Sequence, residues 1–132
     1  MVESAPERST RALILFAHGA RAAAWATPFE RLRDIVAASH TGGPVRLAYL
    51  ELMAPDLPTV VDELVDCGIV QIDLFPIFLS VGSHLRDDLP VLVSAAQARH
   101  PGLTLTVHAA LGESETMLRH IAGGIAQALV SD

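Results

Sequence analysis

Four apolar runs, each followed by a segment with helical periodicity, occupy most of this chain. The apolar runs cover residues 12–17, 45–51, 69–77 and 103–108. Each run is short and continuous, which is typical of a strand that is buried on both faces of a sheet. Strands that alternate with helices predict a parallel sheet with right-handed crossovers and helices on both faces. The sequence therefore predicts an α/β three-layer sandwich with a four-stranded parallel sheet.

The helices are predicted from residues that begin or end them and from apolar spacing. Pro28 lies in the first turn of the first helix, and the stretch 41–44, with two glycines and a proline, breaks it. Asp56 is the expected N-cap of the second helix and Gly68 its expected end. The third and fourth helices are expected at about 85–99 and 114–129. The apolar stripe of the last helix is expected to face inward, and it consists of Leu118, Ile121, Ile125 and Leu129.

Length and composition predict one globular domain. The chain has 132 residues, of which 51% are hydrophobic and 18% charged, and this is enough to bury a core. We expect residues 12–132 to form a single domain and residues 1–11 to be a flexible N-terminal segment. That segment is polar and carries both signs of charge, unlike a signal peptide. No apolar run approaches the roughly 20 residues that span a bilayer, so we expect a cytoplasmic protein without a membrane partner.

Charge and cysteine usage exclude further classes. The formal net charge of −6 argues against nonspecific binding to nucleic acid. The single cysteine, Cys67, excludes an internal disulfide and a cysteine-based zinc site. We interpret Cys67, next to Gly68, as a buried and unreactive thiol.

Two histidines follow apolar runs at equivalent positions. His18 ends the first run, and His84 follows the third run and its loop. The carboxyl ends of parallel strands lie along one edge of the sheet, where ligands bind. Glu51, at the end of the second run, is expected at the same edge. Two imidazoles and a carboxylate suit divalent Fe, Co, Ni or Zn, and without thiolates the binding is expected to be weak and exchangeable.

Each of these residues also has a purely structural interpretation. His18 could be a hydrogen-bonded residue at a strand end, Glu51 could solvate a strand terminus, and His84 could belong to the N-cap region of the third helix. Their coincidence at one edge favours the functional interpretation. Asp87 and Asp88 are interpreted as residues that begin this helix, because acidic side chains complement the helix dipole there.

Other polar residues near the two histidines are weaker candidates for the site. Arg21 and Arg86 flank the two histidines and could bind carboxylates of a substrate through forked hydrogen bonds. Ser80, Gly82 and Ser83 lie in the loop before His84. His108 ends the fourth run at the same edge, but nothing in its neighbourhood requires a ligand. The remaining histidines are interpreted as structural or solvent-facing, and they are His40, His100 and His120.

Three strings resemble the sirohydrochlorin chelatases, the small CbiX-type members of the class II, ATP-independent tetrapyrrole chelatases. The strings are LFAHGAR at 15–21, AYLELMAPDL at 48–57 and PIFLSVGSHLRDDLP at 76–90. The resemblance extends from about Leu13 to Leu129. It implies a chelatase-like, flavodoxin-like half-unit that works as a homodimer. The family usually has serine after His-Gly, where this chain has Ala20.

The resemblance also implies a function. His18 and His84 correspond to the metal-binding and catalytic histidines of the family, and Glu51 corresponds to their acidic partner. The implied reaction inserts Co²⁺ or Fe²⁺ into sirohydrochlorin, for cobalamin or siroheme synthesis, with Ni²⁺ as a further metal. The metal is then a substrate, and no permanently bound cofactor or ATP is implied, since the chain lacks a glycine-rich phosphate loop.

Two other functions remain open from the sequence. The chain could be a non-catalytic carrier of a metal or a tetrapyrrole, which has the same binding residues at the carboxyl edge of the sheet but does not catalyse the reaction. It could also be a flavodoxin-like regulatory domain in which the histidines are incidental. That function would need an acidic phosphoacceptor cluster at the strand ends, where only Glu51 and the more distant Asp73 are near.

Overall fold

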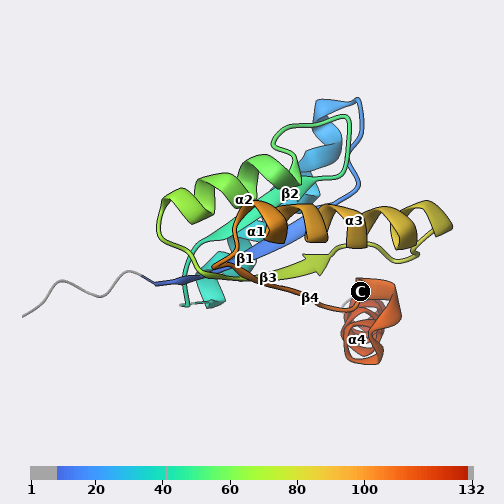
Figure 1. Cartoon of the computed structure of the whole chain (residues 1–132). Coiled ribbons are helices and arrows are strands. Elements are labelled where there is room, and N and C mark those ends of the chain that lie inside the picture. The colour runs from blue at the N-terminus through green and yellow to red at the C-terminus, as the bar shows by residue number, and fades with distance from the viewer. Residues whose placement is uncertain (1–8, 41, 131–132) are drawn as a thin grey trace, which may run out of the picture.

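The computed structural model describes residues 9–40 and 42–130, apart from the side chain of His84. The strands form one parallel sheet in the order β2-β1-β3-β4 (Figure 1). They are β1 (Arg11–Ala17), β2 (Val45–Tyr49), β3 (Gln71–Pro76) and β4 (Thr104–Val107). The fold class predicted from the sequence is confirmed. Residues 1–8 of the expected N-terminal segment lie outside the described residues.

Strand β1 is the central element of the core, because it pairs with β2 on one side and with β3 on the other. Successive side chains of a strand point to opposite faces, and in β1 both faces are covered. Ile14 and Phe16 have no exposed surface and pack in one apolar cluster, whereas Leu15 and Ala17 pack in a second. This is why the run reads as continuously apolar.

The helices divide between the two faces of the sheet. Helices α2 (Leu57–Asp66) and α3 (Ser83–Arg99) pack on the face of Ile14 and Phe16, and α1 (Thr27–Ser39) packs on the opposite face. Two short 3₁₀ helices, η1 (Ala23–Ala26) and η2 (Leu111–Glu113), precede α1 and α4 (Glu115–Val130). None of the described helices has both the length and the apolar character that a membrane span requires.

At the functional edge, two element boundaries differ by two residues from those predicted. Strand β2 ends at Tyr49, since the Tyr49 amide donates to Pro55 O (2.9 Å) and the chain turns there. Glu51 therefore lies in a loop and not at a strand end. Helix α3 begins at Ser83, before the predicted start at 85, so His84 belongs to its first turn.

The inward orientation predicted for the apolar stripe of α4 is wrong for this structure. No residue of α4 is buried, and the exposed fraction reaches 60% at Ile125 and 75% at Leu129. Figure 1 shows α4 standing apart from the sheet beyond β4, seen nearly along its axis. A stripe of this length is normally covered by protein in a soluble domain.

Two further residues differ from their sequence-based interpretation. Cys67 is exposed at the C-cap of α2, so it is not a buried thiol. One expectation for His100 was exposure to solvent. Its side chain is only 19% exposed and lies 2.7 Å from a carboxylate oxygen of Asp62. Hydrogen bonds from His100 and from Arg99 hold the pKa of Asp62 below its usual value and link the end of α3 to α2.

The predicted N-cap of α2 is confirmed, and it yields a test of stability. The Asp56 carboxylate accepts a hydrogen bond from the Thr59 amide (2.9 Å), which holds the pKa of Asp56 below its usual value. We expect Asp56→Ala to lower the free energy of unfolding by about 1 kcal/mol at pH 7. A carboxylate whose pKa is lowered by folding stabilises the protein above its unfolded pKa, and this stabilisation is lost as the pH falls through the folded value.

Urea unfolding at pH 7 and in acid, at one chain concentration, measures this effect. Asp56→Asn is the control, because asparagine is an equally good N-cap but does not titrate. The interpretation is wrong if Asp56→Ala costs the same free energy at both pH values.

Candidate functional site

A cavity of about 540 Å³ opens at the carboxyl edge of the sheet, beside the ends of β1 and β2. Four of the residues predicted for the site line it, namely His18, Glu51, Ser80 and Gly82. They come from three loops that are far apart in the sequence. The parallel topology brings them together because the carboxyl ends of the strands meet at one edge.

The imidazole of His18 and the carboxylate of Glu51 face each other in this cavity. The distance from His18 Nε2 to Glu51 Oε1 is 3.8 Å, and both side chains are about half exposed (52% and 54%). The other ring nitrogen, Nδ1, lies 3.3 Å from Gly19 O. A water-accessible imidazole and carboxylate at this separation can bind a divalent ion and also release it.

A close backbone contact sets the spacing of this pair. The amide of Glu51 donates to His18 O (3.1 Å) and the amide of Leu50 donates to Ala17 O (2.9 Å), which continues the β1–β2 pairing past the strands. Gly19 has a φ of +96°, and a Cβ at this position would lie 1.8 Å from Glu51 O. Only glycine fits there, so the loop after β1 can lie directly against the loop after β2.

Apolar side chains form the rest of the cavity wall. Leu50, Phe78 and Leu85 line it together with the polar residues. The rings of Phe78 and His18 contact each other edge to face, with their centroids 6.1 Å apart and an angle of 83° between their planes. Such a contact restricts the orientation of the imidazole without using either of its nitrogen atoms.

The structure gives the position of the second predicted histidine, His84, in the chain but not its side chain. His84 is the second residue of α3, directly after Gly82 and Ser83, and Gly82 lines the cavity. The side chain of His84 lies outside the described part of the structure. Its role as a ligand therefore stays a prediction.

The structure places three predicted substrate-binding residues outside the cavity lining. Arg21 is exposed in the bend after β1, and Ser83 is exposed at the start of α3. Arg86 forms an ion pair with Glu113 (3.0 Å) and lines a different cavity, between α3 and η2.

Sequence reasoning missed Asp88, which also lines the cavity. It was interpreted with Asp87 as a residue that begins a helix, but the first turn of α3 contains no acidic residue. Because α3 begins at Ser83, both aspartates fall in its second turn, and Asp88 is four residues from His84 on the same side of the helix. The sequence signal for Asp88 was its position four residues after His84, a candidate ligand.

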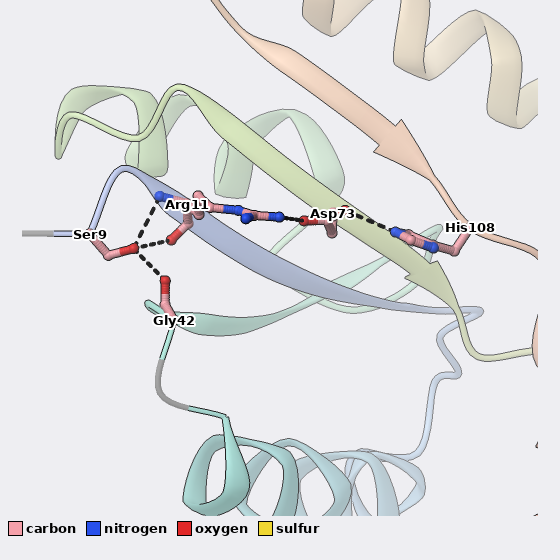
Figure 2. A network of polar contacts seen from close by, with 5 residues as sticks. All are labelled: Ser9, Arg11, Gly42, Asp73 and His108. Carbon is pink, nitrogen blue, oxygen red and sulfur yellow. Dashed lines mark hydrogen bonds and ion pairs between the residues drawn. The ribbon is translucent and has the colours of Figure 1, made fainter.

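His108 does not join the site. Its ring stacks on Phe75 (4.1 Å between centroids), and its Nε2 lies 2.9 Å from Asp73 Oδ1, on the face of the sheet that α1 covers. Figure 2 shows Asp73 between His108 and Arg11, whose guanidinium is 3.6 Å from the other carboxylate oxygen. This network links β1, β3 and β4.

The described side chains alone do not form a complete metal site. Among them there is no group of three or more His, Cys, Asp or Glu residues close enough together to hold an ion. His18 and Glu51 are thus two candidate ligands that this structure brings together.

The close contact at Gly19 predicts a strong effect of one methyl group. We expect Gly19→Ala to destabilise the fold by about 2 kcal/mol, since it combines a strained positive φ with a clash against Glu51 O. Gly102→Ala is the matched control, because a Cβ at Gly102 meets no atom within 4 Å. Urea unfolding of both variants measures the difference, and equal stabilities would contradict this role of Gly19.

Comparison with known proteins identifies the family of this chain. A model of the CbiX family matches residues 12–128. The sirohydrochlorin cobaltochelatase of Methanothermobacter thermautotrophicus is 25% identical over 91 residues, which are 67% of this chain and 63% of that protein. The corresponding enzyme of Methanococcus maripaludis is 23% identical, with 69% and 63% covered. The chain thus spans less than two thirds of the length of these relatives.

Solved structures agree with this result. A CbiX protein from Marinobacter aquaeolei VT8 matches with a TM-score of 0.79 and 30% identity over 92% of this chain and 99% of that one. The sirohydrochlorin chelatase SirB from Bacillus subtilis subspecies spizizenii, in complex with cobalt, matches with a TM-score of 0.75 at 20% identity, over 89% of this chain and 50% of its own. This second likeness shows the shared fold. The family model covers nearly the whole domain, from β1 into α4, and the chain therefore belongs to the CbiX family.

Proposed function

We propose that this chain catalyses the ATP-independent insertion of Co²⁺ or Fe²⁺ into sirohydrochlorin. The observation that carries the proposal is the half-exposed pair of His18 and Glu51 in an open cavity at the carboxyl edge of the sheet. Its support from relatives is the CbiX family match and the cobaltochelatases among the similar proteins. The product would serve cobalamin or siroheme synthesis, depending on the metal.

The chemistry of insertion agrees with weak ligands of this kind. A divalent ion that enters the macrocycle displaces two pyrrole protons, so the site has to give up a metal and receive two protons. A neutral imidazole and a carboxylate can each bind the ion first and accept a proton afterwards. In this proposal His18 and Glu51 do both, and His84 is the second imidazole.

The apolar part of the cavity wall suits a flat, partly apolar ligand. Phe78 and Leu85 offer apolar contact inside the cavity. Leu52 and Leu79, each next in sequence to a lining residue, are 56% and 65% exposed. Arg21 and Arg86 are the candidates for binding carboxylates at the periphery of the macrocycle.

An anaerobic insertion assay tests the proposal. The protein is mixed with sirohydrochlorin and with Co²⁺, Fe²⁺ or Ni²⁺, and the absorbance of the tetrapyrrole is followed. The expected result is metal insertion well above the uncatalysed rate with at least one of the ions. Stoichiometric binding without conversion would instead support the carrier function, and neither binding nor conversion would overturn both.

Removal of the imidazole of His18 is the first specific test. We expect His18→Ala to reduce the rate of insertion about 100-fold or more and to weaken Co²⁺ binding roughly tenfold. His120→Ala is the control, since His120 is exposed on α4 away from the cavity. Calorimetry with Co²⁺ and the insertion assay give the two numbers. Unchanged activity in His18→Ala would remove this residue from the mechanism.

Asp88 gives the site a second negative charge. Of the described side chains that line the cavity, Glu51 and Asp88 carry carboxylates, and no arginine or lysine lines it. Because the walls are partly apolar, this charge attracts a divalent cation more strongly than the same charge on an open surface.

We expect Asp88→Asn to weaken Co²⁺ binding roughly threefold at low salt and less at high salt, as for any partly screened charge. Asp87→Asn is a matched control, because it removes the same charge from the neighbouring residue, which does not line the cavity. Titration with Co²⁺ at two ionic strengths measures the effect. Equal affinities of the two variants would contradict a role for Asp88.

A further inference from the structure

Outside α4, exposed apolar side chains concentrate around the cavity of the candidate site. The three most exposed large ones that are described there are Leu52, Leu79 and Val91, at 56%, 65% and 67%. Leu52 and Leu79 each follow a residue that lines the cavity, and Val91 lines a smaller cavity that shares Leu50 and Asp88 with it. Apolar groups that gather at one exposed place mark an interaction surface.

The backbone of Leu52 distinguishes it from the other two. Among the described residues, Leu52 alone has a positive φ (+66°) without being glycine. A β-carbon is crowded in this left-handed conformation, whereas glycine adopts it freely. Strain of this kind persists only where the surrounding structure holds it, and it collects at functional sites.

Backbone contacts on both sides of Leu52 hold this conformation. Before it, the carbonyl oxygen of Glu51 lies so close to Gly19 that a Cβ there would be 1.8 Å away. After it, the Tyr49 amide donates to Pro55 O (2.9 Å), which closes the loop. The loop therefore keeps a strained leucine directly next to Glu51, the carboxylate that faces His18.

Folding alone does not require a leucine at this position. More than half of the side chain is exposed, so its burial offsets only part of the strain. Glycine would remove the strain altogether. What leucine adds, and glycine lacks, is an exposed apolar surface beside Glu51.

We propose that Leu52 is a specificity residue, which contacts the apolar face of the tetrapyrrole while His18 and Glu51 bind the metal. This inference rests on the proposed function and deepens it. The two tasks fall on successive residues of one loop, since Glu51 offers oxygen ligands and Leu52 offers apolar surface. A macrocycle that rests on Leu52 is thereby held next to a metal ligand.

Leu52→Gly and Leu52→Ala test this inference, because both remove the apolar side chain and only glycine also removes the strain. In both variants the dissociation constant of metal-free sirohydrochlorin is expected to rise about fivefold, as for the loss of about half of the contact of a leucine. The urea midpoint of Leu52→Gly is expected to lie above that of Leu52→Ala. A loss of affinity in the more stable variant does not come from a damaged fold.

Three controls accompany these variants. Leu52→Met keeps a large apolar side chain and is expected to bind sirohydrochlorin like the wild type. Val70→Ala is expected to change nothing, because Val70 is similarly exposed (51%) but precedes β3, at the opposite edge of the sheet. The affinity of Leu52→Gly for Co²⁺ is expected to equal that of the wild type. A parallel loss of Co²⁺ affinity would show that the change displaces Glu51, and it would overturn the role of Leu52.

The outcomes separate this inference from the proposed reaction. In the insertion assay Leu52→Gly is expected to raise KM and to leave kcat unchanged. Equal affinities of the wild type and Leu52→Gly for sirohydrochlorin would overturn the role of Leu52 alone. Binding that depends on Leu52 but leads to no insertion would overturn the reaction alone. A wild-type chain that does not bind sirohydrochlorin would overturn both.

Discussion

The pairing of β1 with both of its neighbours determines where everything else in this domain lies. The parallel register continues beyond the strands, since the amides of Leu50 and Glu51 bond to Ala17 and His18. It is tight enough that Gly19 lies against the backbone of Glu51. A site made of side chains from separate loops needs such a fixed frame, because each loop alone is short and exposed. Here the backbone supplies the frame, and the side chains of His18 and Glu51 face solvent.

The sequence was sufficient for the architecture and for half of the site. Continuous apolar runs identified four strands, of which the edge strand β4 is mostly exposed, and their alternation with helices identified the parallel sheet. His18 and Glu51 could be assigned to one edge because parallel strands end together. The exact start of α3 could not be predicted, since Gly82 serves as its N-cap without a side chain that would mark it. Because α3 begins two residues earlier than predicted, His84 lies inside the helix. For the same reason Asp88 lies in the second turn and not at the start of the helix.

Periodicity predicts which side of a helix is buried, but it does not identify the surface that covers it. For α1 and α2 the cover is the sheet of the same chain. For α4 the stripe is apolar as predicted, but no residue of this helix is buried. His108 shows that a residue at the predicted edge does not always belong to the site. It follows a strand at the correct edge, yet its ring lies flat on Phe75 and bonds to Asp73, which no pattern in the sequence indicates.

The domain separates what makes it stable from what makes it reactive. No polar side chain is among its buried residues, so the described core is held together by apolar packing and backbone hydrogen bonds. The polar groups of the cavity contribute little to folding because they are half exposed and already hydrated. They can therefore change ligand or protonation state without disturbing the sheet. The proposed reaction needs this independence, since a ligand set that also stabilised the fold would hold the metal too tightly to transfer it.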